Sequence, residues 1–171
     1  MKHLLILQIE NNGIHEQIYK NLSETEKKAL DKINEKYFLK PDCRKKFRVV
    51  ITGGVFDILH AGHIFTLNEA KKHGDVLVVA IARDEVIKKK NRNLLHSQEH
   101  RAFMVESLKP VDVVILGKEN PAEIFEQVKP DVIVYGYDQK PFLTPKGIEI
   151  VQLNEQFGEI KTNKIIKELG L

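Results

Sequence analysis

Short apolar runs alternate with helix-type patterns along the chain from Phe47 onward. The runs are rich in β-branched residues and are bounded by glycine, proline or aspartate, which is typical of strands buried on both faces. Five such runs occur, and they read FRVVITGG, DVLVVAIA, VDVVILG, PDVIVYG and IEIVQL. The hydrophobic pattern therefore predicts five strands in this part of the chain.

The segments between these runs carry the start and stop signals of helices. HIFTLNEAKKHG has apolar residues at helical spacing, and Ser97 and Asn120 stand at the N-cap positions of SQEHRAFMVESLK and NPAEIFEQVK. TNKIIKEL is expected to be a closing helix with Thr162 as its cap. Because strands and helices alternate, we expect parallel βαβ units, and hence an α/β fold with a doubly wound five-stranded parallel sheet over residues 47–171.

Residues 1–46 depart from this pattern and are predicted to form a small N-terminal helical extension and linker. KHLLILQIE, IHEQIYKNL and SETEKKALDKINEKYFL indicate two or three short helices, the last opening with Ser23 and Glu26 in the register of a capping box. The segment lacks a strongly basic face. We therefore expect it to pack against the main domain or a second subunit rather than to bind DNA as a helix-turn-helix.

Composition restricts the class and the location of the protein. Of 171 residues, 42% are hydrophobic and 30% are charged, which are globular values. Cys43 is the single cysteine, and the chain has neither a signal-peptide core nor the roughly 18 consecutive apolar residues of a membrane span. A net charge of +3 gives no basis for nucleic-acid binding. These features predict a cytoplasmic protein without membrane or nucleic-acid partners.

Candidate chemistry lies between the first strand and its helix, in GGVFDILHAGH at residues 53–63. Adjacent glycines allow close approach of a ligand to the backbone, and a helix N-terminus offers free N–H groups to an anion. Neither the G-x-x-x-x-G-K-[ST] motif nor G-x-G-x-x-G spacing is present, which excludes a P-loop and a dinucleotide fingerprint. The loop is instead suited to a phosphate-binding turn that presents two imidazoles.

Spacing alone leaves three interpretations of His60 and His63 open. As structural residues, His60 would cap the turn and His63 would lie on the helix surface. As metal ligands, they would join Asp57, although no second cluster completes a coordination sphere. As phosphate ligands, they would donate hydrogen bonds to a nucleotide whose α-phosphorus is under attack.

The residues around the histidines resemble a known family. GVFDILHAGHI resembles the G-T-F-D-x-x-H-x-G-H signature of the cytidylyltransferase-like branch of the nucleotidyltransferase α/β superfamily, whose fold is Rossmann-like. Val55 replaces the usual threonine, so any contact from a side-chain hydroxyl is lost. The resemblance implies that these residues hold a nucleoside triphosphate: Gly53, Val55, Phe56, His60, Gly62 and His63.

Three further stretches extend the resemblance. ARDEVIKKKNR places Lys90 and Arg92 where the family reaches the triphosphate. HSQEHR is similar to glycerol-3-phosphate cytidylyltransferases and implies a basic contact from Arg101. PDVIVYGYDQ is similar to archaeal FAD synthases, whose G-Y-D-Q turn lies at the nucleotide site, and implies contacts from Gly136 and Asp138.

The last stretch, EIKTNKIIKEL, resembles the closing [ST]-[ST]-x-K-I helix start that binds phosphate in the family. It implies phosphate contacts from Lys161 and Thr162. Lys161 and Asn163 replace the expected hydroxyl residues, so Thr162 is the only hydroxyl that remains, while Lys161 still offers a positive charge.

Together these resemblances imply an enzyme that transfers a nucleoside monophosphate from ATP or CTP to a phosphate monoester and releases pyrophosphate. His60, His63 and Lys90 are the expected catalytic residues. Mg²⁺ or another divalent cation would be held by the phosphates rather than by side chains alone, with Asp57 as the one carboxylate considered as an added ligand. The family resemblance also implies a homodimer.

The acceptor and the base are less strongly specified. The G-Y-D-Q turn favours ATP and FMN, and the apolar residues Phe142 and Leu143 in the connection YDQKPFLTPKG suit an isoalloxazine. HSQEHR instead favours cytidylyl transfer from CTP to glycerol 3-phosphate or a similar small phosphate. A third hypothesis, from another class, is a non-catalytic nucleotide-sensing module whose N-terminal helices bind DNA or a protein partner.

Overall fold

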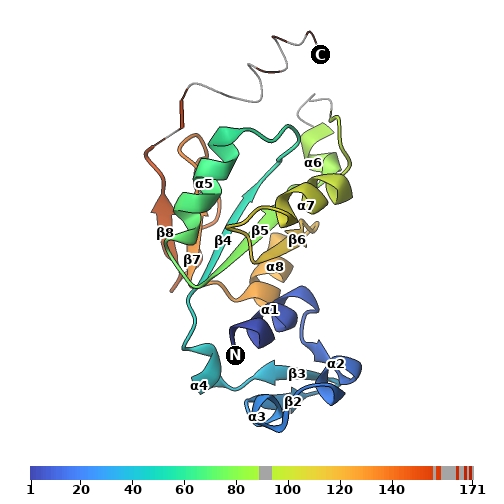
Figure 1. Cartoon of the computed structure of the whole chain (residues 1–171). Coiled ribbons are helices and arrows are strands. Elements are labelled where there is room, and N and C mark those ends of the chain that lie inside the picture. Colours follow the sequence, from blue (N-terminus) through green and yellow to red (C-terminus); the bar gives the residue numbers. More distant parts are fainter. Residues whose placement is uncertain (89–93, 156, 159–164, 166–167, 169, 171) are drawn as a thin grey trace.

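A computed structural model describes residues 1–88, 94–155, 157, 158, 165, 168 and 170. A five-stranded sheet with the order β6-β5-β4-β7-β8 forms its centre (Figure 1). The strands are β4 (Val49–Gly54), β5 (Val76–Ile81), β6 (Val113–Leu116), β7 (Val132–Tyr135) and β8 (Glu149–Gln152). Every neighbouring pair is parallel. The structure thus confirms the predicted doubly wound α/β fold, with the winding reversing at β4.

The helices of the α/β unit begin where the sequence signals predict. They are α5 (Ala61–Lys71), α7 (Gln98–Glu106) and α8 (Pro121–Val128), together with a short helix that the sequence analysis did not predict, α6 (Asp84–Lys88). The Ser97 hydroxyl accepts from the His100 N–H at 3.4 Å, and the Asn120 side chain accepts from the Ala122 N–H at 3.1 Å. Both predicted N-caps are therefore confirmed, whereas the predicted closing helix at Thr162 lies outside the described residues.

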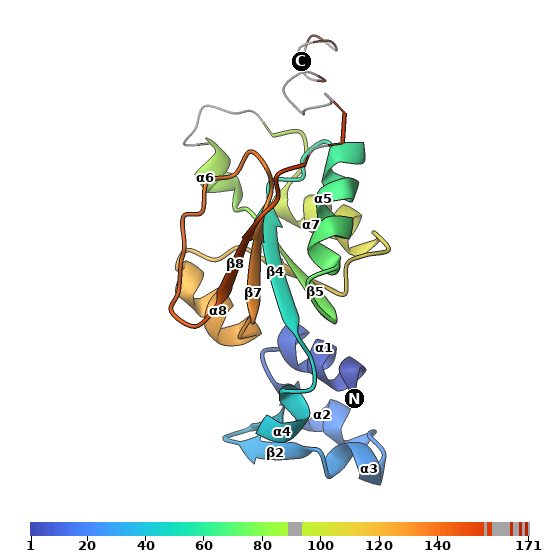
Figure 2. The same cartoon turned by 90° about the vertical axis from the view of Figure 1, so that its left-hand side faces the viewer.

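Successive residues of the strands face opposite layers of the molecule. Val50 packs in one hydrophobic cluster with Leu67 of α5 and Val105 of α7, whereas Ile51 packs in the other cluster with Ile124 of α8. Figure 2 shows α5 and α7 on one side of the sheet and α8 on the other. This three-layer arrangement follows from strands that are apolar on both faces.

The N-terminal segment is not purely helical, so that part of the prediction is wrong. Its elements are α1 (Lys2–Glu10), β1 (Ile14–His15), α2 (Glu16–Lys20), α3 (Glu24–Lys27), β2 (Leu30–Ile33), β3 (Lys36–Leu39) and α4 (Pro41–Arg44). The strands form an antiparallel sheet in the order β1-β3-β2. The predicted capping box of Ser23 and Glu26 is present, but the helix that it opens has only four residues. Asn34, with φ 55°, turns the following chain into a hairpin.

Helix α1 docks the N-terminal segment onto the α/β unit. Leu4, Leu5 and Ile9 are fully buried and belong to the same hydrophobic cluster as the α8 face of the sheet. The Gln127 side-chain amide donates to the Ile9 carbonyl at 2.7 Å, and Lys2 pairs with Asp112 at 2.8 Å. The expectation that this segment packs against the main domain is confirmed. Within the described part of the chain, no helix is both long and apolar enough to cross a bilayer.

Candidate active site

His60 lies in the turn between β4 and α5 and His63 in the first turn of α5, and we call these two turns together the histidine corner. It lies at the carboxyl ends of the parallel strands, an edge that we call the mouth of the sheet. β4 ends at Gly54, and α5 begins at Ala61 with His60 as its N-cap residue. The imidazole rings of His60 and His63 stack, with centroids 3.9 Å apart and planes inclined by 27°. Because the His60 side chain makes no cap hydrogen bond to the helix, the geometry does not support the interpretation of His60 as an ordinary cap.

Partial burial keeps both imidazoles uncharged at neutral pH. The pKa of His63 is lowered to about 4, first by burial and then by the neighbouring His60, while the negative charge of Asp138 opposes the shift. Burial also lowers the pKa of His60, again against Asp138. The His63 Nδ1 atom is shielded from solvent and has no hydrogen-bond partner among the described residues. The pair can therefore donate hydrogen bonds as neutral rings.

Phe56 packs behind the histidine pair in an unusual backbone conformation. Its φ is 55°, in the left-handed region that bulky residues rarely adopt, and its side chain is buried. The Phe56 ring lies 5.2 Å from the His63 ring, centroid to centroid, with the planes inclined by 59°. A Cβ atom at Gly54 would lie 2.8 Å from the Phe56 ring, so the glycine provides the space that the ring occupies.

The G-Y-D-Q turn after β7 joins the histidine corner. The Gln139 side-chain oxygen accepts from the Gly136 N–H, and its amide donates to the Gly53 carbonyl at the end of β4, both at 2.9 Å. Asp138 is near enough to both histidines for its negative charge to oppose the lowering of their pKa values by burial. The structure thus brings together the predicted residues at 53, 60, 63, 136 and 138. Gln139 joins the turn to the end of β4. The sequence analysis did not predict it as a site residue, although it lies within the G-Y-D-Q motif.

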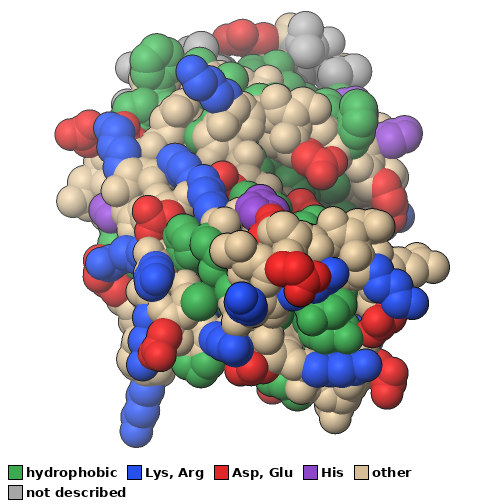
Figure 3. Space-filling model, turned by 60° about the horizontal axis from the view of Figure 1, so that its bottom comes forward, with side chains coloured by type: hydrophobic (Ala, Val, Ile, Leu, Met, Phe, Trp, Pro, Cys, Tyr) green, Lys and Arg blue, Asp and Glu red, His purple; other side chains and the backbone are tan. Residues whose placement is uncertain are grey.

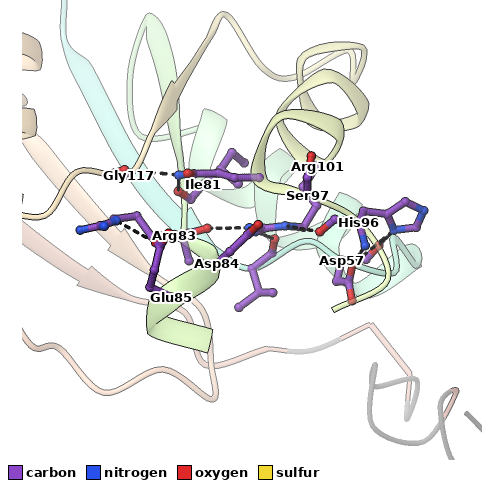
Figure 4. Close-up of polar contacts among 12 residues, drawn as sticks. Asp57, Ile81, Arg83, Asp84, Glu85, His96, Ser97, Arg101 and Gly117 are labelled. Atoms are coloured by element: carbon purple, nitrogen blue, oxygen red, sulfur yellow. Dashed lines mark hydrogen bonds and ion pairs between the residues drawn. The ribbon is translucent and has the colours of Figure 1, made fainter. Parts of the chain in front are cut away.

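Arg101 has a different environment from the one expected. Its side chain is fully buried, and its guanidinium group donates to the Val55 carbonyl at 2.5 Å, the Ala82 carbonyl at 2.8 Å and the Asp84 carboxylate at 2.5 Å (Figure 4). Its Nε atom donates to the His96 carbonyl at 3.3 Å. Because these protein oxygens occupy the guanidinium donors, the geometry supports a role in holding loops and does not support the expected direct phosphate contact.

Asp57 is likewise engaged by the protein. Its buried carboxylate accepts the N–H groups of Leu95 at 3.0 Å and His96 at 2.9 Å, and the Nδ1 atom of His96 lies 3.2 Å from it. The interpretation of Asp57 as a metal ligand therefore finds no support in this geometry. Within the part of the chain that is described, no three His, Cys, Asp or Glu side chains group as metal ligands.

The remaining predicted site residues divide into two groups. Gly62 lies in the first turn of α5, and Val55 contributes its carbonyl to the Arg101 hydrogen bond. Four predicted phosphate ligands lie outside the described residues, and they are Lys90, Arg92, Lys161 and Thr162.

Several known proteins are similar in sequence to this chain. A family model described as cytidylyltransferase-like matches residues 51–169. An FAD synthase from Aciduliprofundum boonei is 51% identical over 92 residues, which cover 53% of this chain and 62% of that protein, less than two thirds of its length. An FAD synthase from Thermococcus sibiricus is 41% identical over 140 residues, which cover 74% of this chain and 94% of that protein.

A solved structure shows the same fold. It is described as the lipopolysaccharide core biosynthesis protein from Thermoplasma volcanium, and its TM-score to this chain is 0.58 at 35% sequence identity. The match covers 65% of this chain and 98% of that chain, so nearly all the residues without a counterpart are in this chain.

Proposed function

The chain belongs to the cytidylyltransferase-like family, and from this premise we propose that it transfers AMP from ATP to FMN, forming FAD and pyrophosphate. One observation carries the proposal. A stacked histidine pair lies at the mouth of the sheet beside a G-Y-D-Q turn, in a chain that is 39–51% identical to proteins described as FAD synthases. The geometry supports a place for the phosphates, and the relatives support the base and the acceptor.

In the proposed reaction, a phosphate oxygen of FMN attacks the α-phosphorus of ATP. The bond from the α-phosphorus to the oxygen that bridges to the β-phosphorus breaks, and pyrophosphate leaves with that electron pair. Such transfers need little covalent chemistry from the protein, because positioning and stabilisation of charge supply most of the catalysis. The reaction needs no nucleophile from the protein, which agrees with a site whose central side chains are two neutral imidazoles.

His60 and His63 contact the triphosphate in this proposal and act mainly in the transition state. Their Nδ1 atoms are shielded from solvent, so the proposal assigns the ligand contacts to the Nε2 atoms. From there the rings donate hydrogen bonds to oxygens on the α and β phosphates, where charge grows in the transition state. Mg²⁺ held by the phosphates would supply further charge neutralisation. Predicted contacts to the phosphate chain remain those of Lys90, Arg92, Lys161 and Thr162.

The loop after β7 supports a planar aromatic acceptor. Phe142 is 77% exposed, and its ring meets the Tyr135 ring edge-on at 5.7 Å between centroids. The Tyr135 hydroxyl donates to the Leu143 carbonyl at 2.9 Å and accepts from its N–H at 3.2 Å, which holds the loop against the end of β7. An exposed phenylalanine fixed beside the mouth gives an isoalloxazine an apolar surface on which to stack.

The nucleotide-sensing alternative has less support, because the N-terminal segment has a poor surface for DNA. Helix α3 has four residues and carries Glu24 and Glu26. Lys27, Lys32 and Lys40 each pair with a nearby carboxylate at 3.0 to 3.9 Å. Figure 3 shows basic and acidic side chains interspersed on the face that the N-terminal segment presents. Binding to the DNA backbone requires positive charge that local carboxylates do not neutralise.

The proposal is tested by supplying the full chain and Mg²⁺ with ATP or CTP, each paired with FMN or glycerol 3-phosphate. We expect FAD and an equal amount of pyrophosphate from ATP with FMN, identified by chromatography and mass. Preferential formation of CDP-glycerol from CTP and glycerol 3-phosphate would establish the cytidylyltransferase alternative. Nucleotide binding without pyrophosphate release from any pair, together with retention of duplex DNA, would establish the sensing module.

A further inference from the structure

Phe56 adopts a backbone conformation that its own sequence position does not favour. Four residues other than glycine have positive φ among the described residues, and two of them are asparagines in the N-terminal segment while a third, Lys129, ends α8. Phe56 alone among them lies in the histidine corner. A bulky residue is strained in this region, so neighbouring interactions must maintain the conformation.

The residues on both sides of Phe56 are held by buried polar groups. Before it, the Val55 carbonyl accepts from the guanidinium of Arg101 at 2.5 Å. After it, the Asp57 carboxylate accepts two backbone N–H groups from Leu95 and His96, at 3.0 and 2.9 Å. The peptide unit before Phe56 and the side chain of the residue after it are thereby held by residues outside the loop.

Arg101 and Asp57 both bind the backbone of His96. The Arg101 side chain is held in one geometry, because its donors reach four oxygens in three segments of the chain, including the His96 carbonyl at 3.3 Å. Asp57 holds the N–H of the same residue. Figure 4 shows Asp57 and Arg101 approaching the stretch around His96 and Ser97 from two sides. Arg101 and Asp57 therefore hold one shared piece of backbone.

The Phe56 ring connects these contacts to the two histidines. The ring lies over Gly54 and against His63, and His63 in turn stacks on His60. We propose that Arg101 and Asp57 are positioning residues that hold Phe56 in its left-handed conformation and so fix the orientation of the His63 ring in the mouth of the sheet. Neither residue touches the reacting atoms.

Substitution of arginine by lysine separates this role from the mere presence of a positive charge. Lysine keeps the charge opposite Asp84 but lacks the planar fork that reaches several carbonyls at once. In Arg101→Lys we expect the Val55 carbonyl to be released, Phe56 to relax towards negative φ, and the His63 ring to gain solvent and rotational freedom.

The test combines a titration of His63 with steady-state kinetics. Proton NMR of the full chain, with His63 assigned by its loss in His63→Asn, should show the His63 resonance titrating at least about one pH unit higher in Arg101→Lys than in the wild type, because burial contributes less. The kcat for FAD formation should fall about tenfold or more, while KM for ATP changes less than about threefold, as expected for misplacement rather than lost binding. The kinetic part rests on the proposed function, whereas the titration does not.

Arg44 provides the matched control. Its guanidinium donates to the carbonyls of Phe47 and Lys129, both at 2.7 Å, and pairs with Asp131, but at the opposite, amino-terminal end of the sheet. Arg44→Lys should lower the melting temperature and leave both the His63 titration and kcat unchanged. If Arg44→Lys moves the titration as far as Arg101→Lys does, the effect is general loosening and the proposal is overturned.

Asp57→Asn gives an independent variant if Arg101→Lys does not fold. It keeps the side-chain size but leaves one oxygen to accept two N–H groups, and we expect the same upward change in the His63 titration and the same split between kcat and KM. A His63 titration and a kcat that match the wild type in the folded variants would overturn the proposal and assign both residues to the scaffold alone.

Discussion

Two stacked imidazoles form a hydrogen-bonding surface that carries no net charge. Two protonated rings with centroids 3.9 Å apart would repel each other, so stacking and burial both favour the neutral forms of His60 and His63. A neutral donor binds phosphate oxygens less strongly in the ground state than a cation would. Its contribution can therefore be concentrated in the transition state, where the charge on those oxygens grows.

The shifted pKa of His63 predicts how stability depends on pH. The folded pKa is about 4 and the ordinary value is 6.5, so between these pH values the unfolded chain binds more protons than the folded chain. This group therefore lowers stability as the pH falls from 6.5 towards 4, by up to about 3 kcal/mol. Urea unfolding at pH 7 and pH 4.5 should show a smaller loss of stability for His63→Asn than for the wild type. Equal losses would contradict the assignment.

Phe142 is expected to affect the acceptor and not the nucleotide. Removing an aromatic stacking partner costs about 0.5–1.5 kcal/mol, so Phe142→Ala should raise KM for FMN by about 3- to 10-fold, with KM for ATP unchanged. Phe103, 72% exposed on α7, is a matched control, and Phe103→Ala should leave both constants unchanged. An equal rise in both KM values for Phe142→Ala would place the side chain against the nucleotide instead.

At the scale of elements, helix α1 is part of the core rather than an appendage. Leu5 is fully buried, so Leu5→Ala should lower the free energy of unfolding of the whole chain by about 2–5 kcal/mol. Ile33, 54% exposed in β2, is the control, and Ile33→Ala should change it by less than about 0.5 kcal/mol. Urea unfolding measures both. A second, separate transition that alone responds to Leu5→Ala would show that the N-terminal segment unfolds independently.

The strands of the α/β unit could be predicted because their signal is local. Continuous β-branched runs such as Val49 to Ile51 fit a strand that is buried on both faces, and caps such as Ser97 mark where the next helix starts. The N-terminal hairpin could not be predicted in the same way, because a real capping box at Ser23 opens a helix that ends after one turn. Tertiary packing of Tyr37 and Leu39 then selects the strand.

The sequence predicts which residues form the site better than it predicts which atoms those residues contact. The residue types of the histidine corner and the G-Y-D-Q turn already indicate a phosphate site, and parallel strand ends bring them together. The direction of the Arg101 side chain could not be predicted, because a basic residue at a helix start can point to solvent or inward. Only the tertiary structure shows that Val55, Ala82 and His96 present carbonyls to it.

Across the whole molecule, the two ends of the sheet serve different purposes. The mouth carries the histidine pair and the loop with Phe142, and the N-terminal segment packs at the opposite end (Figures 1 and 2). Hence the N-terminal segment packs against the fold without covering the mouth, and the proposed chemistry lies at the end where helix N-termini and strand ends converge.

The most direct test of this account is the rate of FAD formation by the double variant His60→Ala/His63→Ala beside the wild type, with ATP binding measured by calorimetry on both. The folded variant should bind ATP with nearly unchanged affinity while kcat falls by at least about 10²- to 10³-fold, because the lost hydrogen bonds act mainly in the transition state. A variant that forms FAD at the wild-type rate would contradict it.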